Sequence, residues 1–93
     1  MKKIEIEYPV STYDTLIIDI DELINMGIEE LKSDGVESIN DFLLDEFGNN
    51  IGYYLEKYGL NEFDYEESAW DIIVDRTYSE IEDRLNELEE LPL

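Results

Sequence analysis

The side chains in this chain that could do chemistry are almost all carboxylates. Twenty-six aspartates and glutamates stand against six lysines and arginines in 93 residues, and there is no histidine and no cysteine. The formal net charge of −20 far exceeds the roughly 2 to 8 that keeps a small domain soluble. A compact domain with this charge repels itself, so solubility alone does not account for the excess. The composition therefore predicts electrostatic binding to something cationic.

The carboxylates are densest in the last third of the chain. Residues 61–93 contain twelve acids and two bases, a net charge of −10, which the first 60 residues reach with fourteen acids and four bases. On a helix here, five carboxylates fall on one row at spacings of four or eight, interrupted by Ser79. They are Glu67, Asp71, Asp75, Asp83 and Glu87, and we expect them to form a straight acidic ladder. Carboxylates four residues apart are separated by about 6 Å along the helix axis, whereas a DNA strand carries one phosphate per about 3.4 Å. With their neighbours, the predicted partner-binding residues are Asp64, Glu66, Glu67, Asp71, Asp75, Glu82, Asp83 and Glu87.

Metal binding and catalysis find little support in the spacing of these residues. Asp45 and Glu56 match positions 1 and 12 of a calcium-binding loop, but Phe47 holds position 3 and Asn50 replaces the glycine at position 6. Without histidine or cysteine, the commonest acid–base group and the thiolate nucleophile are missing, and there is no glycine-rich phosphate loop. We therefore expect no catalytic residues, no metal and no cofactor, and a protein that is not an enzyme.

Two other interpretations of the acidic helix remain open. A run of acidic residues is commonly no more than a solvated face, and a halophile's surface has a similar composition. The solvated-face interpretation does not explain why the helix keeps charges that destabilise it, since like charges four residues apart oppose helix formation by about 0.2 to 0.5 kcal/mol per pair. Selection for binding would explain why they are tolerated. On the other flank, Arg76, Glu80 and Arg84 form an ordinary mixed-charge pattern that supports the helix.

The elements that hold these residues belong to a folded protein. Apolar residues make up 43% of the chain and aromatic residues 12%, which is a globular and not a disordered composition. Residues 1–93 suit a single domain without disulfides or metal. There is no signal-peptide-like apolar run and no stretch of about 18 apolar residues, so we expect a cytoplasmic protein without a membrane segment.

The N-terminal third alternates in hydrophobicity. Within Lys3–Tyr8, isoleucines and a tyrosine alternate with glutamates, and Thr15–Ile20 alternates again, which favours a β-hairpin across Pro9–Asp14. Helical spacing from Tyr13 to Leu31 leaves one long helix over residues 11–33 as the alternative. In the hairpin interpretation, Asp21 caps a helix that ends near Ser33.

The remaining residues carry helical patterns. Ser38 with Asp41 predicts a short helix that ends at Gly48, and Asn50 begins another that ends at Gly59. Asp64 with Glu67 predicts the start of a long amphipathic helix whose inward stripe is Trp70, Ile73, Thr77, Ile81, Leu85 and Leu88. Among the tyrosines, we expect Tyr54 and Tyr58 in the core or at its rim, and Tyr53, Tyr65 and Tyr78 as exposed anchors. The predicted fold is α+β: an N-terminal hairpin, three short helices and a long C-terminal helix, with an all-α fold plus one N-terminal strand as the alternative.

In size and charge, and in the segment NEFDYEESAWDIIVDRTYSEIEDRLNELEEL, the chain resembles the small acidic DNA-mimic inhibitors of phages and mobile elements, of the anti-CRISPR and anti-restriction type. The resemblance implies an inhibitor in the host cytoplasm. It would occupy the cationic DNA- or RNA-binding groove of a CRISPR effector or other host-defence nuclease, with no cofactor and no direct nucleic-acid binding. The alternatives are an immunity protein or antitoxin that blocks a basic nuclease toxin, and an acidic module for a histone-like partner. Because a hairpin is marginal alone, the chain is expected to be a monomer or a homodimer.

Overall fold

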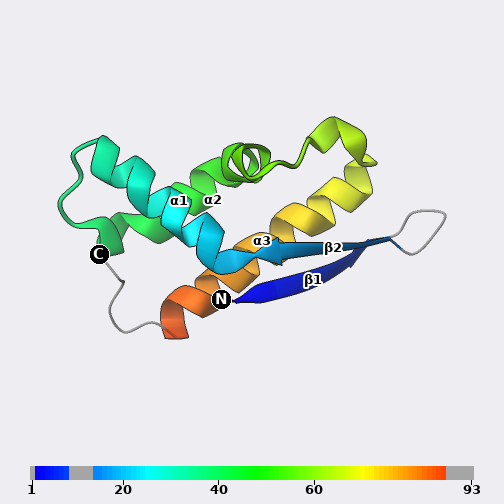
Figure 1. The fold of residues 1–93 in the computed structure, drawn as a ribbon, viewed down its shortest axis with the longest axis horizontal. Coiled ribbons are helices and arrows are strands. Elements are labelled where there is room, and N and C mark those ends of the chain that lie inside the picture. The colour runs from blue at the N-terminus through cyan, green and yellow to red at the C-terminus, as the bar shows by residue number, and fades with distance from the viewer. Residues whose placement is uncertain (1, 9–13, 88–93) are drawn as a thin grey trace.

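The computed structural model describes residues 2–8 and 14–87, and within them a hairpin precedes three α-helices (Figure 1). This α+β architecture confirms the predicted fold class. In chain order the elements are β1 (Lys3–Tyr8), β2 (Asp14–Asp19), α1 (Ile20–Ser33), α2 (Ile39–Tyr58), the 3₁₀ helix η1 (Glu62–Asp64) and α3 (Glu67–Glu87).

The two strands pair in an antiparallel register that places their isoleucines on one face. Ile4 lies opposite Ile18 and Ile6 opposite Leu16. Ile4, Ile6 and Ile18 are buried, as the alternation predicts; the side chain of Tyr8 lies outside the described part. Because residues 14–19 pair with β1, the alternative of one long helix over residues 11–33 is wrong.

Helix α1 begins two residues earlier than predicted. Its N-cap is Asp19, whose Oδ1 accepts a hydrogen bond from the Glu22 backbone N–H at 3.2 Å. Asp21, the predicted cap, lies in the first turn. The difference arises because Ile20, which continues the alternation of the strand, is already helical and is fully buried. The helix ends as predicted, and Gly35 follows at φ +79°, where glycine avoids backbone strain.

Helix α2 joins two segments that the sequence predicts as separate helices. The predicted break survives as a kink at Asn50 (φ −131°, ψ 24°), whose side-chain amide donates to the Glu46 carbonyl oxygen at 3.3 Å. Ser38 precedes the helix as predicted, but its side chain makes no capping hydrogen bond. Gly59, at φ +126°, follows the last turn.

Helix α3 begins three residues later than the predicted cap, because Asp64 belongs to η1. Its 21 residues extend over about 32 Å, most of the longest dimension of the molecule, 45 Å. The predicted stripe is buried at Ile73, Thr77 and Ile81, while Trp70 and Leu85 are only half-buried. Leu88 lies outside the described residues.

The core lies between the isoleucine face of the hairpin and the three helices (Figure 1). β1 contacts α1 and α3, and α2 packs against both of these helices. Gly27 allows the close approach of α1 and α2, since a Cβ at this position would lie 2.6 Å from the Phe47 ring. Within the described residues, no helix is long and apolar enough to cross a membrane.

Candidate partner-binding surface

All eight predicted partner-binding carboxylates lie at exposed positions. Among the ion pairs of the described residues, only one involves any of the eight: Glu87 Oε2 lies 3.0 Å from Arg84 Nη1. The other seven have no cationic partner there and are exposed to solvent. They are Asp64, Glu66, Glu67, Asp71, Asp75, Glu82 and Asp83.

The helix does not arrange these carboxylates in the predicted straight ladder. An α-helix turns about 100° per residue, so each step of four residues advances about 40° around the axis. From Glu67 to Glu87 the row therefore turns by about 200°. The contacts agree: Asp75 lies beside α2, whereas Glu87 pairs with Arg84, which reaches Asp21 on α1.

Three of the carboxylates do share one outward direction. Asp71, Asp75 and Glu82 lie within about 40° of one another around the axis, opposite the buried Ile73 stripe, and we call them the α3 outward carboxylates. They are separated along the axis by about 6 Å and about 10.5 Å. Glu67 lies at one margin of this strip, and the exposed, uncharged Ser79 lies at the other.

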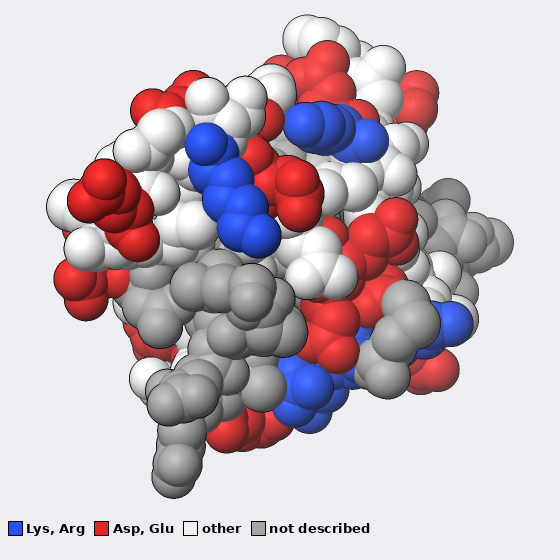
Figure 2. All heavy atoms as spheres, turned by 60° about the vertical axis from the view of Figure 1, so that its left-hand side comes forward, with Lys and Arg blue, Asp and Glu red and all other residues white. Residues whose placement is uncertain are grey.

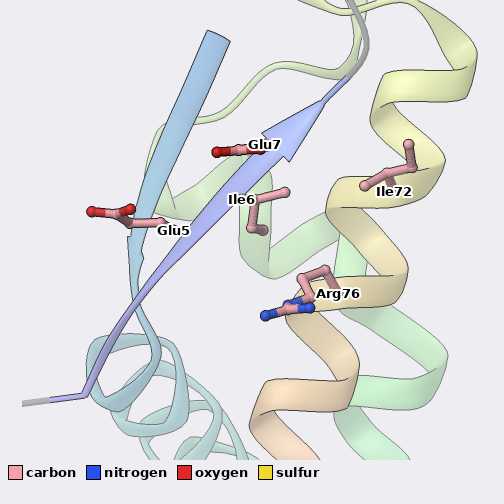
Figure 3. Close-up of a pocket in the computed structure, with 5 residues that line it drawn as sticks. All are labelled: Glu5, Ile6, Glu7, Ile72 and Arg76. Atoms are coloured by element: carbon pink, nitrogen blue, oxygen red, sulfur yellow. The ribbon is translucent and has the colours of Figure 1, made fainter. Parts of the chain in front are cut away.

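The flank of α3 next to β1 has a different character. A hollow of about 320 Å³ here is lined by Glu5, Ile6, Glu7, Ile72 and Arg76. Figure 3 shows Ile6 pointing toward α3, while Glu5 and Glu7 point to the opposite side of the strand. Arg76 Nε lies 3.6 Å from Glu80 Oε1, which confirms the first half of the predicted mixed-charge pattern. This flank is therefore mixed in charge.

The opposite flank brings one of the outward carboxylates to an apolar groove. Asp75 and Ser79 line a groove of about 650 Å³ with Ile51, Val74 and Tyr78, and Gly48 of α2 completes the lining. The groove lies beside the kinked part of α2. A partner could place an apolar side chain here next to a cation that faces Asp75, the combination that typically gives an interface its selectivity.

Arg84 links α3 to the start of α1 and does not continue the mixed-charge row. Its Nε lies 2.9 Å from Asp21 Oδ1, and the Lys2 backbone N–H donates to Asp21 Oδ2 at 3.0 Å. The hydrogen bond from the Arg84 side chain lowers the pKa of Asp21 and, together with the bond to Glu87, raises the pKa of Arg84. The predicted partner of Arg84, Glu80, pairs with Arg76 instead. Arg84 thus joins α3 to α1, and Glu87 is an exposed carboxylate paired with it.

Acidic side chains also lie on the other elements, from the strands to η1. Figure 2 shows several separate acidic patches, with lysine and arginine side chains among them, on the face that it presents. The outward strip of α3 is therefore a region within a generally negative surface. Of the predicted aromatic anchors, Tyr53 is exposed, whereas Tyr65 and Tyr78 are half-buried.

Sequence reasoning predicted none of these hollows, and a further one lies between α2 and the start of α3. It has a volume of about 330 Å³ and is lined by Gly52, Tyr53, Glu56, Glu62 and Trp70. Helical periodicity assigns Trp70 to the core, but its indole is half-buried and its ring lies 5.8 Å from that of Tyr65. The available signal was Gly52, a glycine inside a helical pattern beside an exposed tyrosine.

The described residues contain no group of three or more acidic, histidine or cysteine side chains placed to hold a metal ion. The stretch from Asp45 to Glu56, which has the outer spacing of a calcium loop, lies inside α2.

No protein-family model, curated protein or solved structure matches the chain.

Proposed function

We propose that this protein is an acidic nucleic-acid mimic that occupies the cationic DNA- or RNA-binding groove of a CRISPR effector or other host-defence nuclease. One observation carries the proposal: the α3 outward carboxylates are exposed and unpaired within the described residues, on a helix about 32 Å long, in a chain of net charge −20. A cationic groove is the complement of such a surface.

The mechanism is competition for the phosphate-binding side chains of the partner. Lysines and arginines in a nucleic-acid groove bind phosphates largely through electrostatic attraction and counterion release. Carboxylates at intervals of about 6 and 10.5 Å on a helix would engage the same cations, without the energy needed to bend or unwind a duplex. The high negative charge also steers the encounter and raises the association rate.

Selectivity among cationic proteins needs more than charge. The groove beside Asp75, with Ile51, Val74 and Tyr78 in its wall, offers apolar contacts next to a carboxylate. A few such contacts at the centre of an interface commonly carry most of its binding energy. We therefore place the centre of the interface at Asp75, with Asp71 and Glu82 along the helix.

The test is capture followed by competition. The immobilised protein is incubated with bacterial lysate at physiological salt, and bound proteins are eluted with a short DNA duplex or with guide RNA. The proposal expects a basic nucleic-acid enzyme that the nucleic acid releases. Recovery of proteins that bind no nucleic acid would contradict it. A captured nuclease that is inhibited while still binding its duplex would favour an immunity protein.

A further inference from the structure

The hollow between α2 and the start of α3 combines aromatic rings with carboxylates. Tyr53 and Trp70 supply the rings, and Tyr53 is 49% exposed. Glu56 and Glu62 contribute carboxylates from exposed positions, and neither has an ion-pair partner within the described part of the chain. Such a lining suits a cation with an apolar stem or a flat face.

Gly52, which also lines this hollow, has no structural reason to be glycine. Apart from its chain neighbours and the nearby backbone of its own helix, a Cβ at Gly52 would meet no described atom within 4 Å, and the φ of Gly52 is not positive. By contrast, a Cβ at Gly27 would overlap Phe47, and Gly35 and Gly59 have positive φ, whereas Gly48, like Gly52, is under neither constraint because a Cβ there would be in ordinary contact with Tyr78 at 3.5 Å. Glycine inside a helix is less favourable than alanine by about 1 kcal/mol. The missing side chain keeps the hollow open, so a side chain of a partner can enter it.

We infer that this hollow receives an arginine side chain of the protein partner. A guanidinium group is planar, stacks on aromatic rings and forms forked hydrogen bonds with carboxylates, so it fits rings flanked by two glutamates better than a lysine ammonium does. The Tyr53 ring already attracts one cation, since Lys57 Nζ lies 5.9 Å from its centroid. The hollow is thus a specific anchor point next to the diffuse charge of α3.

The inference rests on the proposed function for the identity of the partner, but its test needs no partner. The probe is the blocked peptide acetyl-Gly-Arg-Gly-amide, whose single charge limits general attraction to the acidic surface. Binding is followed by ¹H–¹⁵N NMR at the Gly52 amide and at the indole N–H of Trp70, the single tryptophan of the chain. We expect a saturable shift of these two signals, and binding at least about threefold weaker for the matched lysine peptide.

Two substitutions at one position separate the hollow from the fold. Gly52→Leu places a side chain in the hollow and should abolish the saturable shift, whereas Gly52→Ala adds only a methyl group and should retain it. Both residues favour a helix more than glycine does, and thermal unfolding checks that both variants are folded. Peptide shifts spread evenly over the acidic surface, equal binding of the lysine peptide, or unchanged binding to Gly52→Leu would each overturn the inference. None of these outcomes would alter the result of the competition test.

Discussion

Two buried hydroxyl groups, on Thr77 of α3 and Tyr54 of α2, show how single residues affect the stability of the fold. The hydroxyl of Thr77 is fully buried and has no hydrogen-bond partner among residues 2–8 and 14–87. Tyr54 is equally buried, but its hydroxyl donates to Glu46 Oε1 at 2.9 Å. A buried polar group without a partner lowers stability, whereas a paired one does not.

Replacing Thr77 with valine should therefore stabilise the protein. The substitution keeps the shape of the side chain and removes the unpaired hydroxyl, so we expect an increase of about 1 kcal/mol in the free energy of unfolding. Urea unfolding measures it, with Thr77→Ala as the control that should destabilise by leaving a cavity. A less stable valine variant would show that the hydroxyl is hydrogen-bonded.

Tyr54 should make the protein sensitive to alkali. Burial, and then the hydrogen bond to Glu46, raise the pKa of Tyr54 above its ordinary value of about 10. The native state thus holds this proton more tightly than the unfolded state, so the contribution is complete below about pH 10 and is lost as pH rises through the folded pKa. Urea midpoints measured from about pH 9 to 11 should fall less steeply for Tyr54→Phe than for the wild type. Parallel curves would contradict the assignment.

At the scale of elements, the link between α1 and α3 depends on Arg84 and Asp21. Their contact joins residues 63 positions apart in the sequence, and the Lys2 backbone adds the N-terminal strand to it. The hydrogen bond from Arg84 lowers the pKa of Asp21 below its unfolded value, so its stabilising contribution is present above about pH 4 and disappears as pH falls through the folded pKa.

Asp21→Asn should accordingly lower stability at neutral pH by up to about 1 kcal/mol, and the difference from the wild type should shrink as the pH falls below about 4 and through the folded pKa of Asp21. Urea unfolding of both proteins at several pH values provides the comparison. A difference that persists unchanged at low pH would show that the charge of Asp21 is not what joins the helices.

The element boundaries show what the sequence can predict and where it fails. Alternation predicted both strands, and glycines at positions 35 and 59 marked helix ends because a positive φ is a local requirement. The start of α1 was misplaced because Ile20 satisfies both the strand pattern and the helix core. The break predicted at Asn50 is only a kink within α2, because Asn50 alone departs from helical φ and ψ there.

The candidate site was predictable in its residues but not in its shape. Spacing placed all eight carboxylates on the exposed side of the chain, yet a spacing of four residues keeps one direction only over a few turns. The row therefore winds around α3, and Glu87 pairs with Arg84. The hollow at Gly52 and Trp70 escaped notice because its walls come from α2, η1 and α3, which are brought together only by the fold.

At the scale of the whole molecule, charge repulsion opposes folding. The net charge is −20, and the described residues contain few ion pairs to offset it. Screening by salt weakens repulsion between exposed charges, so raising NaCl from about 0.05 to about 0.5 M should raise the urea midpoint. A falling midpoint would indicate that favourable pairs dominate. A chain that folds only in molar salt would support the halophile interpretation of the composition.

We propose that the outward face of α3, and not acidity in general, binds the partner. The most direct measurement compares how well two double variants displace a DNA duplex from the captured enzyme. One variant combines Asp71→Lys and Asp75→Lys, and the matched control combines Glu29→Lys and Asp45→Lys. All four positions are exposed and both pairs change the net charge equally, while Ile73→Ala reports loss of the core. We predict displacement weakened at least about tenfold for the α3 pair and much less for the control. Equal displacement by the two folded variants would contradict the claim.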